Sequence, residues 1–373
     1  MKVMTVLGTR PEIIRLSLVI PLLDKAVEHV LVHTGQNFDD GLDGVFFRDL
    51  GVRPPDANLG ARGGFGTQVG TILSGVERLL LEHRPDRFLV LGDTNSGLSA
   101  IVARRMGVAV YHMEAGNRCH DDRVPEEVNR RIIDHCSTVL MPYTNRSREN
   151  LLREGIPGAR IYTTGNPIKQ VMDRFASKIA ASEILSRLDL ARGKFFLVTM
   201  HRAENVDNPV RLKDLIDALA GLRAKYGYPV VCSIHPRTAS KIDEFGLDAR
   251  TAGLQLLMPM SFFDFIHLER NAFCCVSDSG TVQEEACILG VPNVTIREVT
   301  ERPETVECGS NFLAGTDPAA ILRGVEFVTG DPPAWQPPLE YLAPSVAETT
   351  CRIVAGFHSP DRAELEWAAA ARG

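Results

Sequence analysis

The sequence lacks the features that mark several large classes of protein. Its 41 lysine and arginine residues do not offset its 47 aspartate and glutamate residues, and the formal net charge is −6. No general basic field would therefore attract the phosphates of a nucleic acid. No apolar run approaches the roughly 20 residues of a membrane-spanning helix, and the N-terminus, MKVMTVLGT, has the pattern of one short strand rather than of a signal peptide. We expect a cytoplasmic protein with no nucleic-acid and no membrane partner.

The eight cysteines lack the spacing of a metal site or a disulfide framework. None forms a CxxC pair, and several lie in apolar runs such as FCCVSD, where a thiol acts as a small hydrophobic group. His112, Glu114, Asp121 and His135 could be drawn as metal ligands, but no second cluster with ligand spacing accompanies them. We therefore expect reduced thiols and no metal.

The first strand is not followed by the glycine-rich turn of dinucleotide-binding proteins. That turn has the pattern GxGxxG, whereas this one reads GTRPEI. The glycines between residues 60 and 70 do not follow a convincing strand, so they are a weak substitute. We expect no nicotinamide cofactor.

What the sequence has instead is a regular alternation of strand-like and helical segments, which predicts doubly wound parallel sheets. Strand-like runs of the first series occupy residues 3–7, 29–33, 88–91, 108–113, 139–141 and 161–163, with helices expected over 11–25 and 94–106 among others. After a helical segment near 182–190, a second series of strands occupies residues 195–200, 230–234, 254–257, 273–277 and 293–296.

The length and the two series predict two Rossmann-like α/β domains that face a cleft, the usual place for a small ligand. The expected boundaries are 1–166 for the first domain, 167–344 for the second and 345–373 for a C-terminal helical segment. The Gly- and Pro-rich segment 51–66 is predicted to be a mobile loop, and residues 331–338 to be irregular.

Residues 110–135 concentrate charged side chains in one strand–loop–helix unit. Glu114 would end a strand, and carboxylates at the carboxyl ends of parallel strands line the ligand crevice of open α/β sheets. Glu126 and Glu127 would lie in the positive end of a helix dipole. These two glutamates could act on a ligand, or they could pair at i,i+4 spacing with the two arginines that follow them.

The second domain offers groups suited to a phosphate. The sequence DSGT follows a strand and opens a helix, whose backbone N–H groups can bind an anion that Gly280 lets approach closely. Glu285, one to two turns further on, could hold ribose hydroxyls. Alternatively, Ser279 is only a helix cap and Glu285 only a surface residue. His201 and His235 follow strands too, although single histidines are often structural.

Seven motifs, in this order, resemble the non-hydrolysing UDP-N-acetylglucosamine 2-epimerase family. They are GTRPE (8–12), LGDTNS (91–96), HMEAGNR (112–118), VPEEVNR (124–130), HRAEN (201–205), SDSGTVQEEA (277–286) and TERPE (300–304). The resemblance implies the GT-B fold of two Rossmann-like domains, with a C-terminal helix that crosses back to the first. It also implies a UDP-sugar isomerase of nucleotide-sugar metabolism that needs no cofactor and forms a homodimer.

The resemblance further implies roles for individual residues. It puts four residues in the family's catalytic positions: Asp93, Glu114, Glu126 and His201. Around the UDP it puts Arg10, Ser279, Gly280 and Glu285, with Phe265 beside the uracil.

Three long stretches look like one branch of this family, the UDP-N-acetyl-L-fucosamine synthases: VMTVLGTRPEIIRLS, HTGQNFDDGLDGVFFRDLG and HMEAGNRCHDDRVPEEVNRRIIDH. Arg15 stands where the glucosamine enzymes carry a lysine, and it would lie near Arg10 and contact the sugar. Asp39 replaces the second of two glutamines of an effector pocket, of which Gln36 keeps the first. The likeness implies conversion of UDP-2-acetamido-2,6-dideoxy-L-talose to UDP-N-acetyl-L-fucosamine. The alternative is conversion of UDP-N-acetylglucosamine to UDP-N-acetylmannosamine.

Three other functions remain open on the sequence. A glycosyltransferase of the same architecture would need an acceptor groove and one base rather than several carboxylates around the sugar. A hydrolysing epimerase would release free sugar and UDP. A non-catalytic nucleotide-sugar sensor would not need the set Asp93, Glu114, Glu126 and His201.

Overall fold

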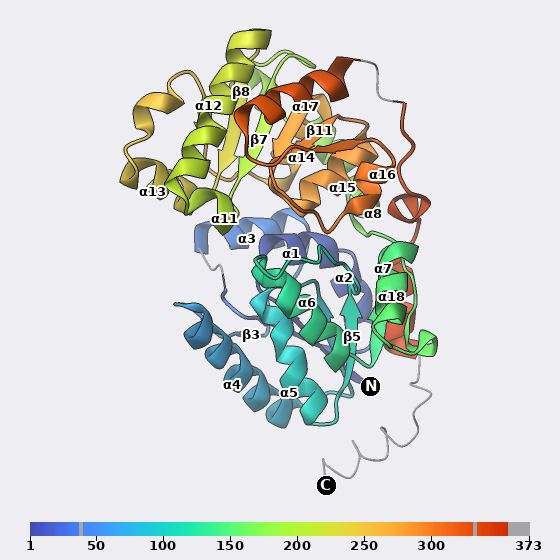
Figure 1. The fold of residues 1–373 in the computed structure, drawn as a ribbon. Coiled ribbons are helices and arrows are strands. Elements are labelled where there is room, and N and C mark those ends of the chain that lie inside the picture. The colour runs from blue at the N-terminus through green and yellow to red at the C-terminus, as the bar shows by residue number, and fades with distance from the viewer. Residues whose placement is uncertain (37–39, 331–333, 357–373) are drawn as a thin grey trace. The chain divides into compact units, whose positions relative to one another are not determined.

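The computed structural model of the protein describes residues 1–36, 40–330 and 334–356. The chain divides into two compact units (Figure 1). The first contains Met1–Val171 and the segment from Glu340 onward, and the second contains Met172–Leu339. The chain therefore leaves the first unit and later returns to it. None of the helices in the described ranges is long and apolar enough to cross a membrane.

The first unit is built on a six-stranded parallel sheet of order β3-β2-β1-β4-β5-β6. The strands are β1 (Lys2–Leu7), β2 (Glu28–His33), β3 (Ala57–Asn58), β4 (Arg87–Leu91), β5 (Ala109–Met113) and β6 (Val139–Met141). The chain moves outward from β1 to β3 and then crosses to β4 on the other side of β1. The carboxyl ends of β1 and β4 therefore meet at the switch point where open sheets bind ligands.

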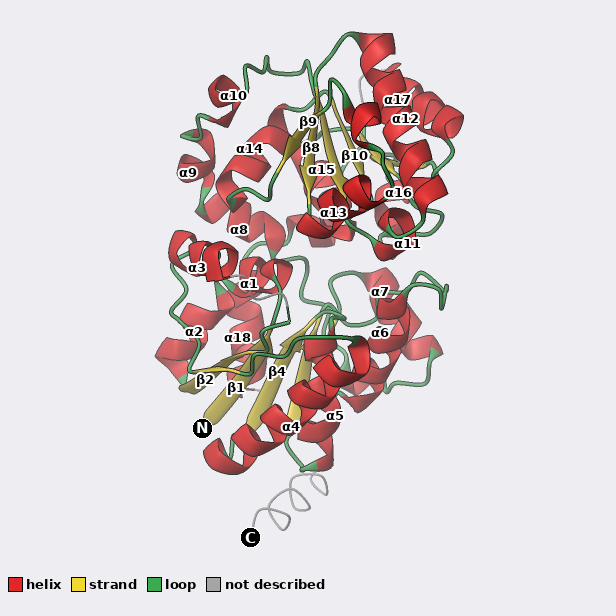
Figure 2. Ribbon diagram, turned by 90° about the vertical axis from the view of Figure 1, so that its left-hand side faces the viewer, coloured by secondary structure: helices red, strands yellow, loops and turns green. Residues whose placement is uncertain are grey.

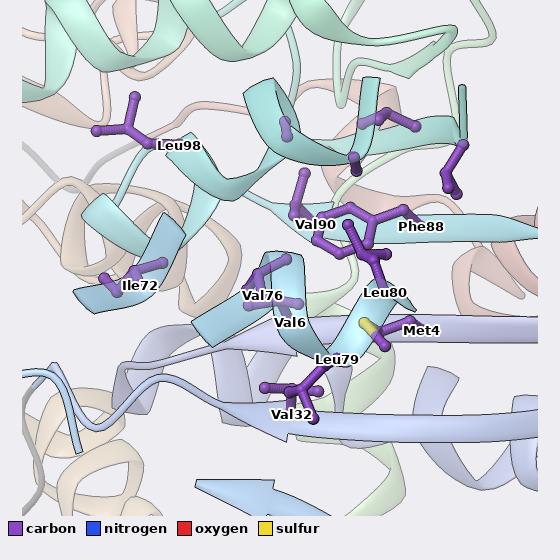
Figure 3. Close-up of a cluster of buried hydrophobic side chains, with 14 of the residues drawn as sticks. Met4, Val6, Val32, Ile72, Val76, Leu79, Leu80, Phe88, Val90 and Leu98 are labelled. Atoms are coloured by element: carbon purple, nitrogen blue, oxygen red, sulfur yellow. The ribbon is translucent and has the colours of Figure 1, made fainter. Parts of the chain in front are cut away.

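Helices cover both faces of this sheet (Figure 2). The helices of the first unit are α1 (Arg10–Leu16), α2 (Val19–Ala26), α3 (Asp40–Asp49), α4 (Phe65–His83), the 3₁₀ turn η1 (Asn95–Ser99), α5 (Ala100–Arg105), α6 (Pro125–Cys136), α7 (Asn145–Arg153), the 3₁₀ turn η2 (Gly158–Arg160) and the start of α8 (Ile168–Arg174), within which the unit ends. One core lies between the sheet and helices α4 and α5 (Figure 3). Its buried side chains include Met4, Val6, Val32, Ile72, Val76, Leu80, Phe88 and Val90.

The C-terminal helix α18 (Val346–Gly356), preceded by the 3₁₀ turn η4 (Leu339–Leu342), completes the first unit. It packs against α2. The side chain of Gln170 donates to Glu348 at 2.7 Å and accepts from the backbone N–H of Ala347 at 2.9 Å. The guanidinium of buried Arg87 donates to the carbonyl of Val354. These bonds tie the last helix to the start of α8 and to strand β4.

The second unit repeats the architecture, with a parallel sheet of order β12-β11-β10-β7-β8-β9. The strands are β7 (Phe196–Met200), β8 (Val230–Ile234), β9 (Gln255–Leu257), β10 (Cys274–Ser277), β11 (Asn293–Thr295) and β12 (Asn311–Leu313). The helices are α9 (Ala176–Ala180), α10 (Ile184–Arg187), α11 (Ala203–Val206), α12 (Pro209–Tyr226), α13 (Pro236–Glu244), the 3₁₀ turn η3 (Asp248–Thr251), α14 (Phe262–Asn271), α15 (Gly280–Leu289), α16 (Pro303–Glu307) and α17 (Pro318–Gly330). Its switch point lies between β7 and β10.

The predicted class, two doubly wound parallel α/β domains, is confirmed, but several elements differ from the sequence-based assignment. The helix expected over 11–25 is two helices, because the chain turns at Ser17, whose hydroxyl donates to the carbonyl of Ile14. The helix expected over 94–106 begins as the 3₁₀ turn η1. The strand expected at 161–163 is only a single bridge between Ile161 and Leu140.

Candidate active site

Glu12, in the GTRPE motif, joins the loops that follow β1 and β4. Its Oε2 accepts the backbone N–H of Gly8 at 3.1 Å and the hydroxyl of Thr9 at 2.7 Å, and its Oε1 accepts the hydroxyl of Thr94 at 3.3 Å. Burial raises the pKa of Glu12 to about 7, although these hydrogen bonds act to lower it. Glu12 was not among the predicted site residues.

Asp93 follows β4 and is held by the helix that carries the VPEEVNR motif. The Nε of Arg130 donates to Asp93 Oδ2 at 2.7 Å, and the amide of Asn129 donates to the Asp93 carbonyl at 3.0 Å. The Arg130 side chain is buried, whereas that of Asp93 is 20% exposed. The carboxylate therefore keeps contact with solvent while an arginine fixes its orientation.

Two adjacent glutamates lie at the start of α6, and the second of them, Glu127, holds the preceding loop through hydrogen bonds. It is buried and accepts the backbone N–H groups of Cys119 and His120, each at 3.0 Å, and Arg130 donates to it at 2.6 Å. Burial alone would raise the pKa of Glu127, but these donors outweigh burial and lower it. Its arginine partner is thus at i,i+3 rather than at the i,i+4 spacing considered from the sequence. Glu126, half-buried, lies in the same first turn.

Glu114 follows β5, the strand next to β4, and its backbone is strained. Its φ of 64° lies in the left-handed region, which costs a non-glycine residue roughly 1–3 kcal/mol. Its side chain is bonded to Arg15, whose Nη1 donates to Oε2 at 2.5 Å, and to the amide of Asn117 at 3.3 Å. Arg15 also lies over the ring of Tyr143 at 5.7 Å.

Both members of the Arg15–Glu114 pair are buried, at 3% and 5% exposure. Arg15 had been expected to contact the sugar. In this structure its guanidinium contacts a predicted catalytic carboxylate.

His112 has both ring nitrogens engaged. Nδ1 lies 2.8 Å from Asp134 Oδ1, and Nε2 lies 2.9 Å from the carbonyl of Gly92. Asp134 also pairs with Arg118 at 2.7 Å. Burial would raise the pKa of Asp134, but His112 and Arg118 lower it. His112 therefore links β5 to α6. Across residues 1–36, 40–330 and 334–356, no three His, Cys, Asp or Glu side chains gather in a way that could hold a metal ion.

Arg10 and Gln36, two further residues singled out from the sequence, both lie in the first unit. Arg10 opens α1 and lies over the ring of Phe46 at 5.9 Å. The side chain of Gln36 accepts from both the backbone N–H and the hydroxyl of Ser96, at 3.3 and 3.2 Å. Asp39 lies outside the described residues.

An open polar hollow of about 450 Å³ on the first unit contains none of the residues that the family resemblance assigns to catalysis or UDP binding. Its charged side chains pair mainly with one another, as in Arg118–Glu154 and Arg131–Asp122. It is lined by Arg118, His120, Asp121, Asp122, Glu127, Arg131 and Glu154. It is therefore not our candidate site.

In the second unit, Asp278 at the end of β10 orients His201 at the end of β7. Asp278 accepts the backbone N–H groups of His201 and Arg202, each at 2.9 Å, and its Oδ1 lies 3.0 Å from His201 Nδ1. Burial would raise the pKa of Asp278, but the imidazole and these amides lower it to about 2. The ring of His201 is 42% exposed, so Nε2 is the nitrogen available to a ligand.

Ser279 and Gly280 begin the ten-residue helix α15. Ser279 occupies the cap position, but its hydroxyl bonds to that of Thr281 at 3.0 Å and does not cap the helix. A Cβ at Gly280 would lie 2.5 Å from Oε1 of Glu301, so only glycine fits here without a shift. The first amides of the helix therefore remain without a side-chain cap, as an anion site requires.

Three arginines lie around this helix start, and none of them was among the predicted site residues. Arg297 pairs with Glu301 at 2.9 Å, and Arg202 lies 3.7 Å from the same carboxylate. Arg302 pairs with Glu284 of α15 at 2.5 Å. The Nη2 of Arg297 is buried and has no hydrogen-bond partner among the residues described. Arg302 belongs to the TERPE motif, so that motif could have identified it as a site residue from the sequence.

The last two predicted residues belong to the helix pair α14 and α15. Glu285 is 6% exposed and therefore not a surface residue. Phe265 of α14 is half-buried and packs against a core that includes Val282 and Ala286 of α15.

Two doubly wound units with polar groups at each switch point define a two-domain α/β enzyme of the GT-B type. The chain matches the family model of UDP-N-acetylglucosamine 2-epimerase over residues 23–355, and it belongs to that family of isomerases. Its activity class is therefore UDP-sugar 2-epimerase.

Individual relatives agree with this assignment. A UDP-N-acetylglucosamine 2-epimerase of Methanococcus maripaludis is 40% identical, covering 90% of this chain and 94% of its own. A UDP-2,3-diacetamido-2,3-dideoxy-D-glucuronate 2-epimerase of Pseudomonas aeruginosa is 37% identical, covering 88% and 93%. The crystal structure of the Methanocaldococcus jannaschii UDP-GlcNAc 2-epimerase in complex with UDP-GlcNAc and UDP has a TM-score of 0.89, with 38% identity and coverage of 95% and 99%.

A UDP-glucosyltransferase from Polygonum tinctorium also matches, with a TM-score of 0.56, 14% identity and coverage of 100% and 98%. At that identity the likeness shows the fold alone.

Proposed function

We propose that the protein inverts C2 of a UDP-2-acetamido sugar and needs no cofactor to do so. The observation that carries this proposal is the carboxylate pair Asp93 and Glu114. They follow the adjacent strands β4 and β5, and each is bonded to a buried arginine. The C2 hydrogen of such a sugar has no neighbouring carbonyl, so a base cannot remove it alone. The bond from C1 to UDP must break as the proton leaves.

The reaction is then an elimination followed by a re-addition. A base takes the C2 proton, the C1–O bond breaks with its electron pair going to UDP, and a glycal with a C1–C2 double bond forms. UDP adds back to C1 while an acid delivers a proton to the opposite face of C2. Both faces need an acid–base group. We assign these transfers to Asp93, Glu114, Glu126 and His201.

The second unit would carry the departing diphosphate. The uncapped first amides of α15, which begins at Gly280, together with the arginines around them, supply donors and positive charge where negative charge develops. We assign Arg10 to the same diphosphate, Glu285 to the ribose and Phe265 to the uracil. The buried position of Glu285 supports this role over that of a surface residue.

For the sugar, we propose UDP-2-acetamido-2,6-dideoxy-L-talose as substrate and UDP-N-acetyl-L-fucosamine as product. The support is the likeness of the long segments around GTRPE and HMEAGNR to that branch, together with Arg15 in place of lysine. Its contact with Glu114 suggests that Arg15 acts on the sugar through that carboxylate, because a forked guanidinium fixes a carboxylate better than an ammonium does. Conversion of UDP-N-acetylglucosamine to UDP-N-acetylmannosamine is the second candidate, and the names of several relatives favour it.

The test is NMR of the purified protein with each UDP-sugar in heavy water and no added cofactor. The epimerised product should carry deuterium at C2, and full retention of hydrogen there would contradict elimination. The two substrates are then compared by kcat/KM. Equal or better turnover of UDP-N-acetylglucosamine would exclude the proposed preference, while steady accumulation of free UDP would indicate a hydrolysing enzyme.

A further inference from the structure

The second unit contains a buried glutamate that the proposed reaction does not use. Glu269 lies on α14 with no exposed surface, and neither of its carboxyl oxygens has a hydrogen-bond partner among the residues described. Its neighbour Leu268 belongs to the apolar core between α14 and α15. An ionised carboxylate left without donors in such surroundings would cost several kcal/mol. The group is therefore neutral or shares a proton.

Glu285, on the helix packed against α14, is a titratable group whose charge acts on Glu269. Burial, and then the negative charge of Glu285, raise the pKa of Glu269 well above its usual value. Burial and the negative charges of the two acids raise the pKa of Cys275 in β10, so its thiol stays protonated. Two carboxyls and one neutral thiol thus share this layer.

The other charged groups on the helices packed against α14 have partners elsewhere. Lys178 of α9 lies over the rings of Phe175 and Phe263 at 5.4 and 5.2 Å. Arg187 of α10 pairs with Asp264 of α14, and Glu284 of α15 pairs with Arg302. His267 of α14 bonds to the carbonyl of Ile179, and the side chain of Arg270 on α14 is exposed to solvent. None of the ion pairs in the described residues gives Glu269 a cation, so only a proton can remove its negative charge.

We propose that Glu269 and Glu285 form a buried carboxyl pair that holds one proton, and that protonated Glu269 is a positioning residue for Glu285. Its O–H donates to Glu285, which stays ionised and presents its remaining lone pairs to the ribose hydroxyls of the nucleotide. The assignment of the ribose rests on the proposed function. The carboxyl pair itself rests on burial, on the packing of the two helices and on the missing donors.

The pair links nucleotide binding to pH. When the shared proton is lost at alkaline pH, a second negative charge appears beside the ligand, and the affinity for UDP falls. Glu269→Gln keeps an N–H donor for Glu285 but cannot ionise, so its affinity for UDP should match the wild type near pH 6 and stay flat to pH 9. Glu269→Met keeps the volume but removes the donor, so it should bind UDP about 10-fold more weakly than Glu269→Gln at every pH.

The experiment is calorimetric titration of the full chain with UDP alone at pH 6, 7, 8 and 9. Glu244→Gln, the same exchange at an exposed position of α13, is the matched control and should follow the wild type. Wild-type affinity that falls with pH while Glu269→Gln stays flat supports the proposal. Parallel pH profiles for the wild type and Glu269→Gln would overturn it.

A second measurement needs no ligand and separates this proposal from the proposed function. Because the pKa of Glu269 is raised in the folded protein, the wild type loses stability as pH rises above the unfolded value, whereas Glu269→Gln does not. The measurement is hydrogen exchange of the β10 amides in the wild type and in Glu269→Gln. The ratio of the protection factor of Glu269→Gln to that of the wild type should rise at least 10-fold between pH 5 and pH 8. A constant ratio would overturn the shared proton. Absence of UDP binding by the wild type, with that growth present, would instead refute the nucleotide part of the proposed function.

Discussion

The bond between Arg15 and Glu114 gives the sharpest test of how the first unit holds its predicted catalytic carboxylate. The perturbation is Arg15→Met, which keeps most of the side-chain volume and removes the guanidinium. Arg15 and Glu114 are 3% and 5% exposed, so water cannot replace the lost donor. Breaking a buried ion pair by removing one partner costs roughly 3–5 kcal/mol.

Protonation sets a ceiling on that cost. An ordinary glutamate has a pKa of about 4.3, so neutralising one at pH 7 costs about 3.7 kcal/mol, and at pH 5 only about 1 kcal/mol. A carboxylate that has lost its arginine will therefore take up a proton rather than remain ionised. We expect Arg15→Met to destabilise the first unit by about 3–4 kcal/mol at pH 7 and by about 1 kcal/mol at pH 5.

The assay is hydrogen exchange of the β5 amides, which reports opening of the first unit separately from the second. Protection should fall by two to three orders of magnitude at pH 7 and by about one at pH 5, after correction for intrinsic rates. In the double variant Arg15→Met/Glu114→Gln, most of the loss at pH 7 should disappear. Equal losses at both pH values, or no recovery in the double variant, would refute the reasoning.

The remaining predictions concern the second unit. Gly280→Ala adds a methyl group 2.5 Å from a carboxylate oxygen and should weaken UDP binding at least 10-fold in calorimetry. The control is Gly70→Ala in helix α4 of the first unit, where an added Cβ meets no neighbouring atom within 4 Å. This control should leave UDP affinity unchanged and stabilise the protein by about 0.5–1 kcal/mol. Unchanged UDP affinity in Gly280→Ala would contradict the predicted anion site. The pKa of Asp278 is lowered to about 2, so its ionised form should add about 2 kcal/mol to the free energy of unfolding. This contribution is present above pH 4 and is lost as the pH falls towards 2. The stability gap between wild type and Asp278→Asn, measured by exchange of the β10 amides, should therefore close below pH 4, and a pH-independent gap would exclude this role.

The sheets could be predicted because buried parallel strands are apolar throughout and alternate with helices. The missed strands, β3 (Ala57–Asn58) and β12 (Asn311–Leu313), are two and three residues long and contain asparagine. Such short edge segments have no periodicity to detect. β3 also lies inside the segment 51–66, which had been predicted to be a loop.

The site could be predicted only in part, because motifs identify residues but not their partners. Arg15 and Glu114 are 99 positions apart, and Arg130 and Asp93 are 37 apart, so no spacing rule relates them. Local spacing instead suggested i,i+4 pairs on α6. Glu269 escaped notice because HLERN on a helix resembles a solvent-exposed face, and only the packing of α14 against α15 shows that the carboxyl is buried.

The return of the chain to the first unit has a consequence for synthesis on the ribosome. All six strands of the first sheet emerge before the second unit, yet the carbonyl that accepts from Arg87 belongs to Val354, 267 residues later. The second unit is translated without interruption and can fold during synthesis, while the first must wait for α18. A premature stop codon just after the second unit would therefore damage the part of the protein that was made first.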